Sequence, residues 1–147
     1  KRVKIEARFA KMESKKSTLT SLVSTTAKDL LAAAEDDVIV KELHFPVNKT
    51  VHLKFRSQDI IHSAYLPHFR VQMNCVPGMN TDFVFKPTIT TEEMRVETAN
   101  EEFEYVLLCN KICGAAHYNM QLKVIVESEE DYNKWIAEQT TFAALNN

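Results

Sequence analysis

Short segments of alternating apolar and polar residues recur along the chain, and turn residues separate them. Alternation with a period of two is typical of a β-strand with one buried face. The expected strands cover residues 1–9, 38–43, 50–56, 69–76, 81–85, 103–109 and 120–126. Few segments indicate helix: residues 27–34, a short polar turn at residues 90–94, and a C-terminal helix that Ser128 and Asp131 would cap. This pattern predicts an all-β fold, a sandwich or barrel, with a short C-terminal helix.

The chain has 147 residues, which suits a single domain with a sizeable core. Residues 1–37 are expected to form an N-terminal strand and a surface excursion of that same domain. Residues 38–139 are expected to form its main part, and residues 140–147 a C-terminal tail.

The composition argues against several classes of protein. The net charge is −2, and Lys and Arg do not cluster with aromatic residues, so we expect no nucleic-acid partner. No apolar run reaches the length of about 18 residues that a membrane-spanning helix needs. There is no signal-peptide pattern, and the first residue is Lys1, so we expect a processed or excised piece of a protein. Three Cys residues are too few for a disulfide framework.

A short stretch between the last two expected strands carries two thiols, one imidazole and one thioether. Cys109, Cys113, His117 and Met120 follow the spacing C-x3-C-x3-H-x2-M. Thiolate and thioether are soft ligands, so this set favours copper. A mononuclear blue-copper site uses one Cys, together with His and a weak axial Met. The second Cys would let two thiolates bridge two neighbouring metals, and a second His should then come from elsewhere in the chain.

Three plainer interpretations of the stretch stay open. The thiols and the imidazole could bind a structural zinc, although such sites rarely include Met. Cys109 and Cys113 could form a disulfide if the loop curls tightly. Met120 alone could simply fill the core, as buried Met residues commonly do.

Several motifs occur in an order that resembles one family. The segment Asp59–Ser63 contains His62 and precedes Leu66-Pro67, the turn Val76-Pro77-Gly78 follows, and the loop Cys109–Met120 comes last. This order is similar to the copper-binding domain of cytochrome c oxidase subunit II, most closely to the forms in bacterial respiratory oxidases. The resemblance implies a cupredoxin-like Greek-key β-barrel or sandwich.

The resemblance also implies a binuclear copper centre, CuA, held by residues 38–139. The two thiolates would bridge both metals, and each imidazole would be a terminal ligand of one copper. The thioether and the backbone carbonyl of Lys111 would be the weak axial ligands. Six residues would thus supply the ligands: His62, Cys109, Lys111, Cys113, His117 and Met120.

The same resemblance implies an electron-transfer subunit of a terminal respiratory oxidase. Electrons would pass from a cytochrome c-type donor through CuA to haem in catalytic subunit I, at the periplasmic face of the bacterial cytoplasmic membrane. Other respiratory-complex subunits are further expected partners, as is the membrane, reached through helices absent from this chain. Two alternatives stay open: a structural or assembly homologue of subunit II in a larger respiratory complex, and a soluble copper carrier.

Lys111 departs from the family pattern, because the family usually has C-x-E-x-C, with a Glu that binds magnesium at the interface with the catalytic subunit. A cationic side chain cannot bind Mg²⁺, which prefers oxygen ligands, so we expect no magnesium site. The Trp that the family usually carries upstream is also missing, with Ile5 near its place and Trp135 the only Trp.

Four more residues carry groups that can bind metals. His44 and His68 are expected near the site or at the surface, and His52 lies on the polar side of its strand. Cys75 is expected to be a small buried strand residue.

Overall fold

The structure is a computed structural model, and it describes residues 35–145. These residues fall into two compact units, which we describe separately. The larger unit contains residues 40–138 and all seven of the described strands. The smaller unit contains residues 35–39 and 139–145, with helix α4 (Phe142–Leu145) and a bridge between Val38 and Thr141. The strand expected at residues 1–9 and the helix expected at residues 27–34 lie outside the described residues.

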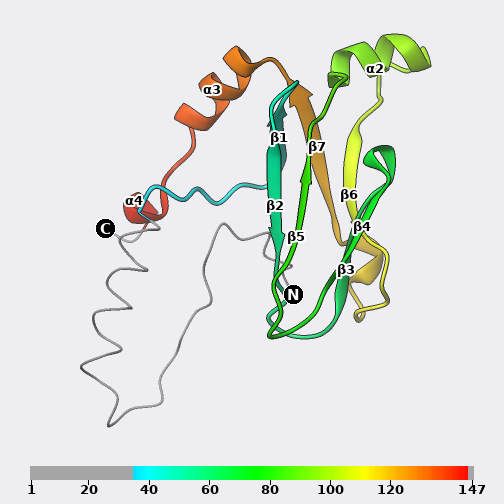
Figure 1. The fold of residues 1–147 in the computed structure, drawn as a ribbon, viewed down its shortest axis with the longest axis vertical. Coiled ribbons are helices and arrows are strands. Elements are labelled where there is room, and N and C mark those ends of the chain that lie inside the picture. Colours follow the sequence, from blue (N-terminus) through cyan, green and yellow to red (C-terminus); the bar gives the residue numbers. More distant parts are fainter. Residues whose placement is uncertain (1–34, 146–147) are drawn as a thin grey trace. The chain divides into compact units, whose positions relative to one another are not determined.

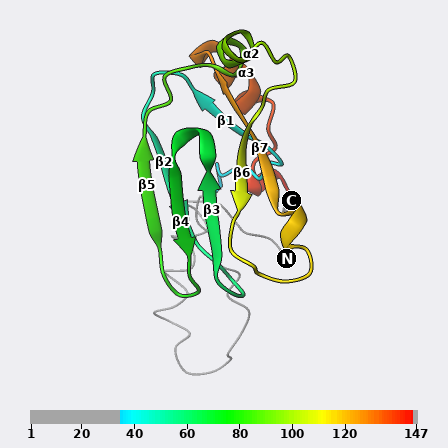
Figure 2. The same cartoon turned by 90° about the vertical axis from the view of Figure 1, so that its right-hand side faces the viewer.

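The strands of the larger unit form two sheets (Figure 1, Figure 2). The larger sheet has the order β1-β7-β6-β3-β4, and β2 pairs with β5 in the smaller one. β1 runs parallel to β7, and all other pairs are antiparallel. The strands are β1 (Leu43–Pro46), β2 (Val51–Phe55), β3 (His62–Leu66), β4 (Val71–Cys75), β5 (Thr81–Phe85), β6 (Tyr105–Cys109) and β7 (Gln121–Glu127).

The core is built from apolar side chains of both sheets. On β2, Leu53 and Phe55 are buried whereas His52 and Lys54 are exposed, as the alternation in the sequence predicts. Leu53 and Phe55 belong to the same buried cluster as residues of β1, β3, β4, β6 and β7. The predicted all-β sandwich is therefore confirmed.

Helices are short and lie between or after the strands. α2 (Thr91–Thr98) begins with a capping box between Thr90 and Glu93, and α3 (Glu129–Ala137) follows the N-cap Ser128. The Asp131 backbone N–H donates to Ser128 Oγ over 3.1 Å, which confirms the predicted cap. The 3₁₀ turns η1 (Pro67–Phe69) and η2 (His117–Asn119) complete the unit.

Several elements differ from the prediction. No strand was expected at β3 (His62–Leu66), and β4 and β6 begin two residues later than expected. The first described strand is Leu43–Pro46 rather than residues 38–43, because residues 43–46 are those that pair with β7. The helix predicted at residues 90–94 extends to Thr98, where Ala99 ends it in a left-handed conformation.

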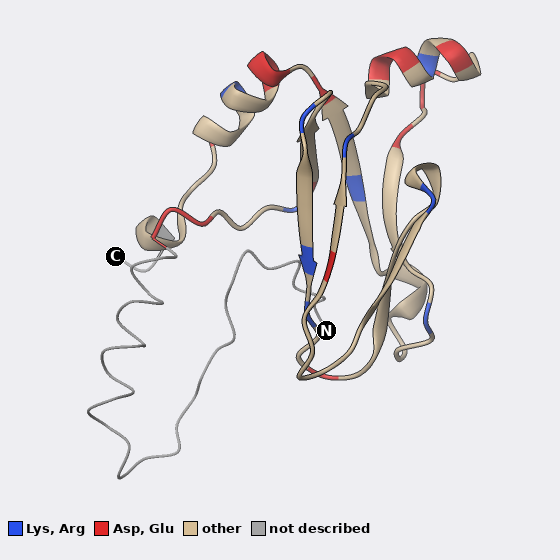
Figure 3. Cartoon of the chain, viewed as in Figure 1, with Lys and Arg blue, Asp and Glu red and all other residues tan. Residues whose placement is uncertain are grey.

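Carboxylates gather at one end of the larger sheet. The first turns of α2 and α3 carry Glu92, Glu93, Glu129, Glu130 and Asp131. Figure 3 shows both helices at the end away from the loop between β6 and η2, in agreement with Figure 1. Acidic side chains in a first helical turn stabilise the helix through its dipole. No helix within residues 35–145 is long and apolar enough to cross a membrane.

Candidate metal centre

The pairing of β3 with β6 brings His62 close to Cys109. Ala64 lies opposite Cys109 in this antiparallel pair. His62 and Ala64 are two positions apart on β3, so their side chains point to the same face of the sheet. His62 is the first residue of β3, a strand that the alternation in the sequence did not predict. Its imidazole therefore comes from a rigid element rather than from a loop.

The segment from Cys109 to Met120 is a closed loop at the end of β6. The Cys109 N–H donates to the Met120 carbonyl over 3.0 Å, which ties the two ends together. The Asn110 N–H donates to the Ser63 carbonyl and ties the loop to β3. Gly114 has φ 130°, a conformation that side-chain-bearing residues rarely adopt, and its carbonyl accepts from the His117 N–H over 3.0 Å. This turn directs His117 back toward the thiols.

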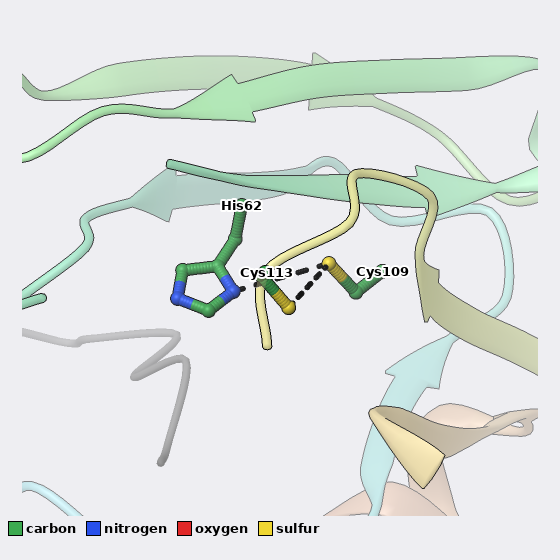
Figure 4. Close-up of side chains that lie close together, drawn as sticks. All are labelled: His62, Cys109 and Cys113. Atoms are coloured by element: carbon green, nitrogen blue, oxygen red, sulfur yellow. Dashed lines mark hydrogen bonds between the residues drawn. The ribbon is translucent and has the colours of Figure 1, made fainter. Parts of the chain in front are cut away.

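The two thiols lie side by side, and each contacts an imidazole. Cys109 Sγ lies 3.7 Å from Cys113 Sγ and 3.9 Å from His62 Nδ1. Cys113 Sγ lies 3.5 Å from His117 Nδ1. Figure 4 shows His62, Cys109 and Cys113 pointing toward one another. The ligand atoms of these three residues all lie within 4.8 Å of one another, so they form a group that could hold a metal ion.

Each thiol also contacts a weaker donor. Met120 Sδ lies 3.8 Å from Cys113 Sγ, and the Lys111 carbonyl oxygen lies 3.3 Å from Cys109 Sγ. The Lys111 residue is exposed, so its backbone rather than its ammonium group belongs to the cluster. All six residues named from the sequence are thus brought together. Sulfur and imidazole donors with a thioether are a set that suits copper.

The electrostatics of the cluster favour a thiolate at Cys109. Burial raises the pKa of this thiol, but hydrogen bonds at the Ser63 and Lys111 backbone and with His62 and His117 outweigh it and lower the pKa from 9.0 to about 6. His62 is fully buried and Cys113 nearly so. A thiolate is the form that binds a metal, and a dry surrounding strengthens its interaction with a cation.

Asp59 belongs to the site although sequence reasoning missed it. Its carboxylate lies 2.7 Å from His62 Nε2, on the side of the ring away from Cys109. The His62 hydrogen bond is the main cause that lowers the pKa of Asp59 to about 2. The only sequence signal is an acidic residue three positions before the His, which is too common to be noticed without the turn geometry.

Three other His residues and Cys75, all within the described part of the chain, are not members of this ligand group. The ring of His44 stacks on Trp135 at 4.0 Å and its Nδ1 lies 2.6 Å from Glu127, so it helps to hold α3 against β1. His52 and His68 are exposed, and Cys75 is fully buried in the core cluster, as expected.

Comparison with known proteins agrees with this geometry. Residues 14–128 match the family model described as cytochrome C oxidase subunit II, periplasmic domain. The chain belongs to this family. The resemblance stated from the motifs is therefore confirmed.

Relatives in bacteria carry the same family name. The chain is 43% identical over 114 residues to an alternative cytochrome c oxidase subunit 2 of Bradyrhizobium diazoefficiens, covering 76% of this chain and 37% of that protein. It is 33% identical over 101 residues to a cytochrome c oxidase subunit 2 of Thermostichus vulcanus, covering 69% of this chain and 27% of that protein. The chain thus spans about a third of the length of the curated relatives it matches.

A solved structure shares the fold. The crystal structure of the periplasmic domain of subunit II of the cytochrome oxidase of Bradyrhizobium japonicum superposes with a TM-score of 0.55 at 24% identity. The match covers 67% of this chain and 62% of that chain. This likeness supports the cupredoxin-like fold that the motifs implied.

Proposed function

We propose that this chain is the electron-transfer domain of a terminal oxidase subunit II and that it holds a binuclear copper centre. Electrons would arrive from a cytochrome c-type donor and leave toward the catalytic subunit. The domain would lie at the periplasmic face of the bacterial cytoplasmic membrane. The observation that carries the proposal is the pair of adjacent thiols, each in contact with one imidazole and one weak donor.

The donor set favours two coppers over a single metal. One tetrahedral zinc needs four ligands, and the family-type site offers six. Cys109 contacts one imidazole, that of His62, and one weak donor, the Lys111 carbonyl. Cys113 likewise contacts one imidazole, that of His117, and one weak donor, the Met120 thioether. Such a doubled set suits two neighbouring ions that share both thiolates. When bound, this centre would exchange one electron and spread the change of charge over both metals.

The residues of the chain would support copper binding and electron transfer in three ways. The lowered pKa of Cys109 means that metal binding near neutral pH has fewer protons to displace from this thiol. The burial of His62 and Cys113 excludes water from one side of the site. The loop itself is at the surface, with Ile112 89% and Tyr118 88% exposed, so an electron-transfer partner can come close to the centre.

The proposal is tested by loading the chain with copper and mixing it with a reduced cytochrome c-type protein. Each loaded chain is expected to take up one electron, measured by the absorbance of the cytochrome. The Cys113→Ser variant, treated in the same way, is the matched control and should accept no electron. Firmly bound copper that accepts no electron would contradict electron transfer. A single, readily exchanged Cu(I) would instead support a copper carrier.

A further inference from the structure

The two imidazoles of the candidate metal centre differ in how their outer nitrogens are held. His62 Nε2 lies 2.7 Å from Asp59 Oδ1. His117 Nε2 has no hydrogen-bond partner among the residues that the structure describes. A carboxylate can only accept a hydrogen bond, so the hydrogen of a neutral His62 ring must be on Nε2. Its Nδ1 lone pair then faces Cys109 Sγ, 3.9 Å away.

We propose that Asp59 is a positioning residue that holds His62 in the tautomer with Nδ1 free for a metal, before any metal binds. The consequence for copper rests on the proposed function, whereas the tautomer itself does not. A carboxylate behind a metal-binding imidazole fixes both the tautomer and the orientation of the ring and makes the ring a better ligand. Asp59 has the place and the chemistry for this role.

Asp59 is itself held in place. Ser57 Oγ donates to Asp59 Oδ1 over 3.3 Å, and the backbone of Ile60 also hydrogen-bonds the carboxylate. Ser57 is buried, its hydroxyl also contacts the Ile60 carbonyl, and its backbone bridges to Pro77. The turn between β2 and β3 thus fixes the carboxylate from one side while His62 holds it from the other.

Burial makes this hydrogen bond matter more than a surface ion pair. The His62 side chain is 1% exposed and has no access to water, whereas the Asp59 side chain keeps 34% exposure. A buried N–H without a partner is strongly unfavourable, so the ring depends on Asp59. The pair between His52 and Asp82 offers a contrast, because it is 3.4 Å long and both side chains are about half exposed. Exposed ion pairs of that kind contribute little to the stability of the folded state.

The test uses the 147-residue chain, copper-free and reduced, with its imidazole nitrogens observed by ¹⁵N NMR. In the unaltered chain His62 is expected to carry its hydrogen on Nε2 alone. In Asp59→Ala this preference should disappear, while His117 in the same sample stays unchanged. Asp59→Asn keeps an acceptor oxygen and should retain the tautomer. Asp82→Ala is the matched control and should alter neither ring.

Copper affinity is the second readout. Loss of such a supporting partner typically weakens metal binding by about 10- to 100-fold, and we expect that loss in Asp59→Ala but not in Asp82→Ala. A hydrogen on Nδ1 in the unaltered chain, or an unchanged His62 tautomer in Asp59→Ala, would overturn the proposal even if copper binds. If the tautomer responds as expected and the unaltered chain binds no copper, the proposed function fails and the positioning role stands.

Discussion

Cys109 Sγ and Cys113 Sγ lie 3.7 Å apart, although one belongs to the end of β6 and the other to the loop beyond it. This separation is too long for a disulfide, so the two sulfurs are adjacent thiols. The short distance between them is what would let both sulfurs contact the same pair of metal ions in the proposed copper centre.

Replacement of either loop thiol is expected to abolish the copper centre. Cys109→Ser or Cys113→Ser would remove a soft ligand from both proposed coppers at once, so the purple colour expected of the copper-loaded chain should be lost. Cys75→Ala is the matched control, because this third thiol lies opposite His62 on β4 but is buried in the core and is not one of the grouped ligands. It should keep the full spectrum and lower the free energy of unfolding by roughly 1 kcal/mol. If Cys113→Ser still shows a spectrum in which two coppers share one unpaired electron, the assignment of Cys113 as a bridging thiolate is wrong.

Replacement of Met120 is expected to leave copper in place. The thioether is a weak donor, so Met120→Leu should keep both metals while the reduction potential shifts. Potentiometric titration followed by absorbance measures the shift. Loss of copper from Met120→Leu at the same protein concentration would mean that the thioether is a principal ligand.

Lys111 is expected to serve the site through its backbone alone. Its carbonyl contacts Cys109 Sγ and the residue is exposed, so Lys111→Glu should leave the copper spectrum nearly unchanged. The potential should fall, because a negative charge favours the oxidised, more positive centre. The corresponding change in the free energy of reduction is on the order of 1 kcal/mol for an exposed charge reversal, and it should shrink as salt is added.

Lys54→Glu, on the exposed side of β2, is the control for the general effect of charge. In an assembled oxidase, Lys111→Glu should also create a site that Mn²⁺ can occupy, detectable by electron paramagnetic resonance. Mn²⁺ bound beside this loop in the unaltered protein would contradict the expectation that no magnesium site exists.

The reactivity of Cys109 in the copper-free, reduced chain is expected to depend on pH below neutrality. Its pKa is lowered from 9.0 to about 6, so the alkylation rate with iodoacetamide should be half-maximal near pH 6. A lowered pKa stabilises the folded state at high pH. The difference in unfolding free energy between the unaltered chain and Cys109→Ser should be largest above pH 9 and should fall as the pH drops toward 6. An alkylation rate that is half-maximal only at pH 8 or above would contradict the lowered pKa of Cys109.

Local patterns in the sequence were enough to predict most strands and the metal loop. Alternation places the buried residues of β2 and the partly buried residues of β5 correctly, because a strand with one inward face needs no partner to be recognised. The ligand types in the Cys109–Met120 loop are visible by spacing alone. The position of β1 was wrong because it depends on pairing with β7, which is distant in sequence. Asp59 was missed because its contact with His62 depends on a turn whose geometry no local pattern shows.

The metal content of the copper-loaded chain, measured together with its electron paramagnetic resonance spectrum, tests the central claim most directly. Two adjacent thiols and the four donors around them predict two coppers per chain and one unpaired electron shared equally by both nuclei. One copper per chain, an electron confined to a single nucleus, or a stoichiometric zinc that copper does not displace would contradict it.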